Sequence, residues 1–98
     1  MKFSEVLDAL KDGERLTNSS LSAKRGCIVR QIPQDISDEV VPKMTSLPQR
    51  AKDAIEGYEL SFKDQVLLIW WDSTKQRYIA TSYIPNWYDI FREDWTIA

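Results

Sequence analysis

The sequence predicts an α+β domain in which a twisted antiparallel sheet is built on a hairpin at residues 66–83 and a helix packs on one of its faces. The hairpin is the first observation, because two strand-like runs flank Asp72–Gln76, which has the length and polar composition of a hairpin loop. The second is an amphipathic helical pattern at the N-terminus, and short helices are also predicted near 46–56 and 86–91. No linker, repeat or low-complexity segment interrupts the chain, so residues 1–98 are predicted to form a single domain.

The two arms of the hairpin differ in pattern. The first arm, Val66–Trp71, is apolar at every position, whereas the second arm, Arg77–Tyr83, alternates more clearly. Successive side chains of a strand point to opposite faces, so an unbroken apolar strand is predicted to be covered on both faces. The remaining segments are therefore expected to cover both faces of the sheet.

The first segment, Phe3–Lys11, is the predicted helix. Its apolar residues recur at spacings of three and four and form one stripe, which is expected to cover a face of the sheet. Ser4 is the predicted N-cap of this helix. Gly13 is the predicted C-terminal stop, because glycine readily adopts the left-handed conformation that ends many helices.

The segments that follow alternate between strands and loops. Glu14–Thr17 and Cys27–Ile32 are predicted strands, and the small, polar and basic residues of Asn18–Gly26 predict a loop between them. Gln34–Glu39 is acidic and is also predicted to be a loop. Val40–Met44 is interrupted by proline and is at best an edge strand.

Two capping patterns place the short helices. Ser46 is followed three residues later by glutamine, which predicts the helix at 46–56, and Gly57 ends it. Asn86 is followed three residues later by an acid, which predicts the helix at 86–91. Strands are predicted over Tyr58–Phe62, before the hairpin, and over Asp94–Ile97, at the end of the chain.

Composition and charge exclude several classes of function. The net charge of −2 argues against wrapping a nucleic acid polymer by neutralising its phosphates. The chain has no histidine and one cysteine, so it lacks the residues for common metal sites, and no catalytic residue or cofactor is predicted. No apolar run reaches the roughly 18 residues that span a bilayer, so no membrane partner is predicted. The lone Cys27 fits a reducing, cytoplasmic setting.

Two short motifs are candidates for binding a ligand. Lys24, Arg25 and Gly26 place two cations beside a glycine whose backbone N–H is sterically open, a combination that can hold a phosphate. The alternative is a solvated basic loop. Either reading leaves the motif in the segment between two predicted strands.

The second motif is Asn86-Trp87-Tyr88-Asp89, at the start of the last helix. Trp87 and Tyr88 offer planar surfaces on which a base can stack, and the alternative is that they pack under the hairpin. Adjacent residues of a helix are about 100° apart, so at least one of the two is expected to face solvent, a partner or a ligand. Asp89 is interpreted as a capping-box acid that could also accept hydrogen bonds from a ribose or a base, with Asn86 as the cap.

Three stretches resemble a family of small phage proteins, the second class of Thoeris anti-defence proteins. They are the opening Met1–Gly13, the insert Val40–Pro48 and the ending Tyr83–Ile97 with its Asp94-Trp95 pair. The resemblance implies sequestration of cyclic ADP-ribose-type signals made by bacterial TIR enzymes, and in some members of cyclic oligonucleotides of the CBASS type. It also implies dimers or tetramers with ligand sites between subunits, and a type II anti-CRISPR belongs to the same family.

The chain departs from the family's pattern at both candidate motifs. The family usually has Trp-Asn-Gly-Lys-Gly after its first strand, and here only a basic residue and Gly26 persist, with Leu21 or Ser22 in place of the tryptophan. The family's Ser-Gln-Thr-Asp before the last helix is here Asn86-Trp87-Tyr88-Asp89, so the cap and the acid remain while the middle pair is aromatic.

The leading expectation is a phage counter-defence protein, active in the cytoplasm of the infected bacterium. It would bind and sequester a cyclic nucleotide or cyclic ADP-ribose-type immune signal without cleaving it. The first alternative is a direct protein inhibitor of a host defence complex. The second is an enzyme that acts on the signal, which the lack of catalytic groups disfavours.

Overall fold

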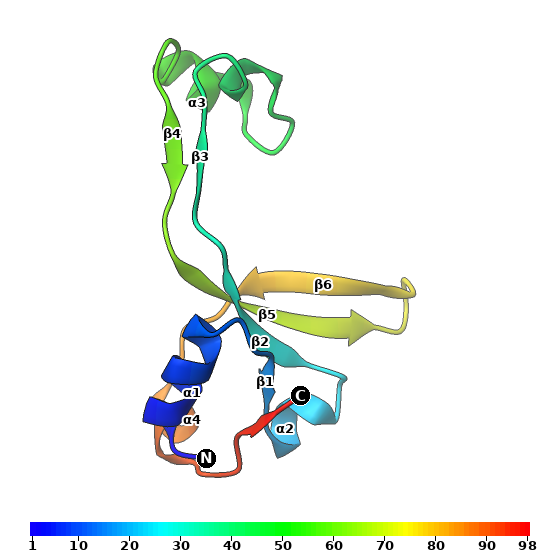
Figure 1. Cartoon of the computed structure of the whole chain (residues 1–98). Coiled ribbons are helices and arrows are strands. Elements are labelled where there is room, and N and C mark those ends of the chain that lie inside the picture. The colour runs from blue at the N-terminus through cyan, green and yellow to red at the C-terminus, as the bar shows by residue number, and fades with distance from the viewer. The chain divides into compact units, whose positions relative to one another are not determined.

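The structure, a computed structural model, describes all 98 residues and contains two compact units. The first unit comprises Met1–Gln31 and Gln65–Ala98, and the second comprises Ile32–Asp64. Both consist of antiparallel strands and short helices, so the predicted α+β class is confirmed (Figure 1). The longest helix has nine residues, and none could cross a membrane.

The first unit holds three helices and a five-stranded sheet. The helices are α1 (Phe3–Lys11), α2 (Ser19–Ser22) and α4 (Trp87–Phe91), and the strands are β1 (Leu16–Thr17), β2 (Cys27–Gln31), β5 (Gln65–Asp72), β6 (Arg77–Ser82) and β7 (Thr96–Ile97). Their order in the sheet is β6-β5-β2-β1-β7, and each neighbouring pair is antiparallel. The predicted hairpin is thus β5–β6, in which Trp71 pairs with Tyr78 next to the loop.

Two predictions for the first unit are wrong in detail. The N-cap of α1 is Lys2 rather than Ser4, because the helix already begins at Phe3, one residue before Ser4. The segment after β1 is not simply a loop: Asn18 caps the short helix α2, its side-chain oxygen accepting a hydrogen bond from the N–H of Leu21 at 3.0 Å. The predicted stop is confirmed, since Gly13 follows the C-cap with φ +85°.

One face of the sheet, here called the core face, packs against α1. Leu16 pairs with Ile28, and Ile28 pairs with Leu68, so these three side chains share that face. The core cluster joins them to the apolar stripe of α1 and to Trp95. Its buried members are Val6, Leu10, Leu16, Leu21, Ile28 and Trp95. The prediction that the N-terminal helix covers one face of the sheet is confirmed.

The other face, here called the open face, carries Cys27, Val29, Leu67, Ile69, Trp71 and Tyr78, as the strand register requires. Every residue of β5 from Val66 to Trp71 is only half-buried. The cover predicted on both sides of this strand is therefore incomplete within one chain. The reason is the short helix α1, which packs on β1 and β2 of the core face and leaves β5 only partly covered.

The second unit is a two-stranded sheet with two short helical segments. Its elements are β3 (Gln34–Ile36), η1 (Val41–Lys43), α3 (Gln49–Ala54) and β4 (Leu60–Phe62), with β3 antiparallel to β4. Val41 is the one buried residue of this unit, at 1% exposure. The Lys52 ammonium donates to the carbonyls of Pro42 and Met44, at 3.3 and 2.9 Å, and ties α3 to η1.

Three predictions for the second unit are corrected. Part of Gln34–Glu39, predicted as a loop, pairs with β4 as β3. The predicted edge strand Val40–Met44 is instead the 3₁₀ turn η1, because proline fixes the φ that the first position of a helix needs. The helix expected at 46–56 spans only Gln49–Ala54, and its N-cap is Pro48 rather than Ser46.

Candidate functional site

Lys24 and Arg25 each lie over a tryptophan at the end of β5. The Lys24 ammonium is 5.5 Å from the centre of the Trp70 ring, and the Arg25 guanidinium carbon is 5.5 Å from the centre of the Trp71 ring. The N–H of Trp71 also donates to the Lys24 carbonyl at 3.2 Å, which fixes the loop to the strand. Trp70 and Trp71 point to opposite faces, so the two cations are divided between the core face and the open face.

Gly26 shapes the loop that carries these cations. Its N–H donates to the Leu21 carbonyl at 2.7 Å, so that N–H already has a partner and is not open to an anion. A Cβ at this position would lie 3.0 Å from the same carbonyl oxygen, which explains the glycine. Arg25 itself has φ 54°, a left-handed conformation that disfavours most side chains other than glycine and asparagine.

A hollow of about 310 Å³ lies on the open face beside Arg25. It is lined by Arg15, Arg25, Cys27, Val29, Ile69 and Tyr78. The Tyr78 ring is 58% exposed and packs edge-on against Trp71, with centroids 5.0 Å apart. Sequence reasoning did not single out Arg15 or Tyr78. For Tyr78, the one signal in the sequence is its position opposite Trp71 across a short hairpin loop.

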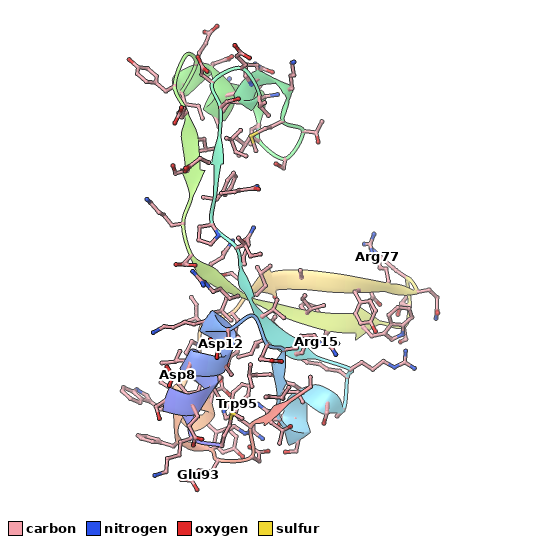
Figure 2. All side chains as sticks on the ribbon, in the orientation of Figure 1. Asp8, Asp12, Arg15, Arg77, Glu93 and Trp95 are labelled. Carbon is pink, nitrogen blue, oxygen red and sulfur yellow. The ribbon has the colours of Figure 1, made fainter.

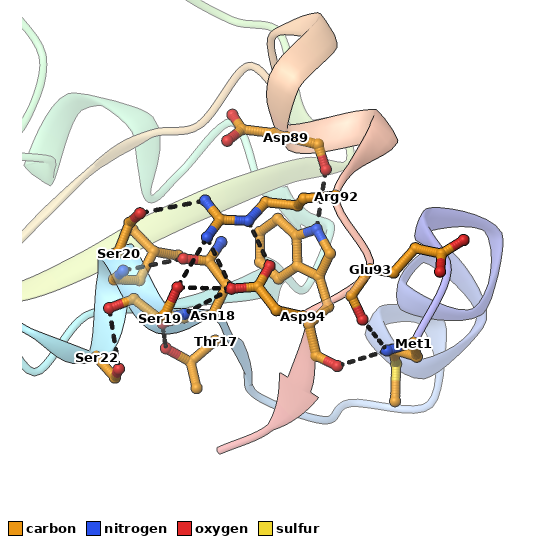
Figure 3. A network of polar contacts seen from close by, with 12 residues as sticks. Met1, Thr17, Asn18, Ser19, Ser20, Ser22, Asp89, Arg92, Glu93 and Asp94 are labelled. Atoms are coloured by element: carbon orange, nitrogen blue, oxygen red, sulfur yellow. Dashed lines mark hydrogen bonds and ion pairs between the residues drawn. The ribbon is translucent and has the colours of Figure 1, made fainter.

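The polar residues of the second motif serve the helix α4. The Asn86 side chain accepts from the N–H of Asp89 at 2.8 Å, and the Asp89 carboxylate accepts from the N–H of Asn86 at 3.2 Å. The capping-box interpretation of Asp89 is therefore confirmed. The Asp89 carbonyl also accepts from the indole N–H of the buried Trp95 at 2.9 Å, which fixes α4 to the core (Figure 3).

The aromatic residues of the same motif face outward. Trp87 is 72% exposed and Tyr88 is 69% exposed, so the expectation that at least one of them points away from the core is confirmed for both. Trp87 stacks on Phe91 with centroids 5.7 Å apart and an interplanar angle of 21°. The three exposed aromatic residues of α4, Trp87, Tyr88 and Phe91, are here called the α4 aromatic surface.

Arg92, which sequence reasoning missed, connects α4 to α2. Its guanidinium forms an ion pair with Asp94 and donates to the hydroxyls of Ser19 and Ser20 at 3.1 and 3.3 Å (Figure 3). It also lies over the exposed Tyr88 ring, 5.0 Å from its centre. The Asp94 carboxylate further accepts from the hydroxyl and the N–H of Ser19, at 2.6 and 3.1 Å. These contacts hold Tyr88 in place and leave the guanidinium largely occupied.

The groups around Arg92 have shifted ionisation. The Arg92 guanidinium, and then the Ser19 hydroxyl, hold the pKa of Asp94 well below its usual range. Burial and the neighbouring Asp89 carboxylate raise the pKa of Tyr83, whose hydroxyl oxygen is buried and has no hydrogen-bond partner. Asp94 therefore stays charged at neutral pH, and Tyr83 stays neutral.

The two candidate motifs do not converge within one copy of the chain. α4 contacts α1, the helix on the core face, whereas Arg25 lines a hollow on the open face. No residue of the second motif lines that hollow. The structure thus offers two aromatic surfaces, one of them rich in cations, on opposite sides of the sheet.

The comparisons with known proteins bear on the whole chain. The Thoeris anti-defense 2-like domain family matches residues 1–98, which is the full length of the sequence. The comparison with curated proteins gives no match. Because the family match includes both candidate motifs and every element of the sheet, the chain belongs to the Thoeris anti-defense 2-like family.

Proposed function

We propose that this anti-defence protein binds and sequesters a cyclic nucleotide or cyclic ADP-ribose-type immune signal without cleaving it, in the cytoplasm of an infected bacterium. The observation that carries the proposal is the pairing of Lys24 and Arg25 with Trp70 and Trp71, in a chain that belongs to an anti-defence family. Nucleotides need cations for their phosphates and rings for their bases. Arg25 and Trp71 offer both on the open face, and Lys24 and Trp70 offer both on the core face.

The second part of the proposal concerns self-association. A small ligand cannot touch the α4 aromatic surface and the open face of the same copy, because the sheet lies between them. In a dimer or tetramer, α4 of one copy could instead stack on a ligand whose phosphate is held by Arg25 of another. Light scattering during size exclusion should then give a mass above the 11.4 kDa of one chain, and a monomer at micromolar concentration would contradict this.

Calorimetry with a defined panel tests binding. The panel contains cyclic dinucleotides, cyclic trinucleotides and isomers of cyclic ADP-ribose, each titrated into the purified protein. Sequestration predicts saturable binding of at least one compound, and chromatography should recover that compound intact after the complex is denatured by heat. Recovery of a linear or shortened product would instead indicate an enzyme.

One observation favours a second candidate, a direct protein inhibitor of a host defence complex. The α4 aromatic surface exposes a tryptophan stacked on a phenylalanine, and an exposed tyrosine follows the tryptophan in the chain. Aromatic residues of this kind are enriched in protein interfaces. This candidate predicts no binding to the nucleotide panel. It also predicts that Trp87→Ala, rather than substitutions at Arg25, abolishes protection of a phage against the host defence.

A further inference from the structure

The open face has the construction of a binding surface at the position where Arg25 lies. Its floor is apolar, formed by Cys27, Val29 and Ile69, which come from the central strands β2 and β5. These positions are fixed by the register of the sheet, so the floor is a rigid platform rather than a loop. Residues on this platform remain half-buried with no layer of the same chain over them.

Two arginines flank this apolar floor. Arg15 precedes the buried Leu16, so the alternation of side chains along the chain brings Arg15 to the open face. Its backbone is held by the residue that follows β7, since the N–H of Ala98 donates to the Arg15 carbonyl at 2.7 Å. Its guanidinium also donates to an oxygen of Ala98 at 3.5 Å. Figure 2 shows Arg15 beside the sheet of the first unit. No acidic residue lines the hollow, so its charge is complementary to an anion.

Arg25 is held in a conformation that a flexible surface arginine would avoid. Its left-handed backbone, at φ 54°, is held by the turn that ends α2, in which the Arg25 N–H donates to the Ser22 carbonyl and the Gly26 N–H donates to the Leu21 carbonyl. Strain of this kind persists where the surrounding structure over-determines it, and it is enriched at ligand-binding positions. The contact with Trp71 then positions the guanidinium before any ligand arrives.

The aromatic wall and the size of the hollow define what would fit. Arg25 occupies one side of Trp71, whereas Tyr78 stands edge-on to that ring and is 58% exposed, which leaves its own face available for stacking. The volume of about 310 Å³ is at the lower limit for small-molecule pockets, which run from roughly 300 to 1,000 Å³. One nucleotide fits such a space, and a whole cyclic oligonucleotide does not.

We propose that the open face is a nucleotide subsite, in which Arg15 and Arg25 hold a phosphate between them and Tyr78 stacks on the attached base. This inference rests on the proposed sequestering function and adds Arg15 and Tyr78 to its binding residues. The remainder of a larger ligand would extend beyond the hollow. The sole cysteine, Cys27, lies on the floor of the subsite and can report its occupancy.

The test uses the full chain and two readouts. Calorimetry with cyclic di-AMP, cyclic di-GMP and cyclic ADP-ribose measures affinity for the wild type, Arg15→Gln and Tyr78→Ala. Arg77→Gln, a cation in β6 on the other face of the hairpin, and Tyr58→Ala, an exposed tyrosine of the second unit, are the matched controls. In parallel, the rate at which the neutral reagent iodoacetamide alkylates Cys27 is measured with and without each compound.

We expect Arg15→Gln and Tyr78→Ala each to weaken binding by roughly tenfold or more, with both controls at wild-type affinity and Cys27 alkylated more slowly in the complex. Wild-type affinity in both subsite variants, with Cys27 alkylated at an unchanged rate, would overturn the subsite and leave the sequestering function standing. If no compound of the full panel, cyclic trinucleotides included, binds the wild type, the sequestering function fails, and ADP then decides the subsite alone. The subsite is supported if ADP slows the alkylation of Cys27 in the wild type but not in Arg15→Gln. It is rejected if ADP does not slow the alkylation of Cys27 in the wild type.

Discussion

Arg92 and Asp94, two residues apart, form a bidentate ion pair. The distance from Nε to Oδ1 is 2.5 Å, and the distance from Nη2 to Oδ2 is 2.8 Å. The same carboxylate accepts two hydrogen bonds from Ser19, so the pair joins the segment after α4 to the start of α2. A carboxylate with four donors is stabilised in its charged form. The pair therefore links the position of Tyr88, over which Arg92 lies, to the body of the first unit.

Lowering the pH should weaken this junction. The pKa of Asp94 is lower in the folded protein than in the unfolded chain, mainly because of Arg92 and then because of Ser19. The charged carboxylate therefore stabilises the fold fully above the unfolded pKa of about 3.9. This stabilisation is lost as the pH falls through the folded pKa. Asp94→Asn should have a lower urea midpoint than the wild type at pH 6, and the difference should shrink at pH 3. A difference that stays constant between these pH values would contradict the assignment.

Trp87→Ala separates a binding role of α4 from a structural one. Because Trp87 is 72% exposed, its truncation should change the free energy of unfolding by only about 0.5 kcal/mol, while a lost stacking contact would weaken ligand binding by about 1–3 kcal/mol. The melting temperature and the calorimetric affinity of the same variant measure both quantities.

Leu68→Ala is the control for Trp87→Ala. Leu68 packs against the core cluster, so its truncation should cost about 2 kcal/mol or more of stability whatever the protein binds. If Trp87→Ala melts at as low a temperature as Leu68→Ala, Trp87 stabilises the fold and does not serve as a stacking surface for a ligand.

Arg25→Asn tests the strained cation. Asparagine tolerates the left-handed conformation better than arginine does, so relief of backbone strain should offset the loss of the contact with Trp71. The free energy of unfolding should then change by about 1 kcal/mol or less, and the melting temperature should stay within a few degrees of wild type. Affinity for a nucleotide from the panel should fall. Unchanged affinity in a fully folded Arg25→Asn protein would show that Arg25 does not hold the phosphate.

Gly26→Ala should disturb the loop that carries both cations. The added Cβ would meet the Leu21 carbonyl oxygen at 3.0 Å, and that oxygen belongs to backbone that cannot swing away, so we expect a loss of about 1–3 kcal/mol in stability. Chemical denaturation measures the loss, with the exposed Ser22→Ala in the same segment as the control. Equal stability of the two variants would mean that the turn accommodates a side chain.

The elements of this fold were largely readable from local patterns. The stripe from Phe3 to Leu10, the capping box at Asn86 and Asp89, and the hairpin around its polar loop each depend on neighbours within a few residues, and each appears in the structure. The family, too, was recognisable from the opening and closing segments, and the match over the whole chain confirms it. Interactions between residues that are close in the sequence can be predicted directly from the sequence.

The grouping of the candidate binding residues required the register of the sheet. Lys24 and Arg25 are adjacent in the sequence, yet they lie over rings on opposite faces, because the strand beneath them alternates its side chains. Arg15 and Tyr78 are far apart in the chain and meet Arg25 only because β1, β2, β5 and β6 pair in a particular order. Likewise, Ser19 and Ser20 find Arg92 only when α2 and α4 have packed on the same core. Long-range contacts of this kind depend on which strands pair and which side chains share a face, and no local pattern specifies either.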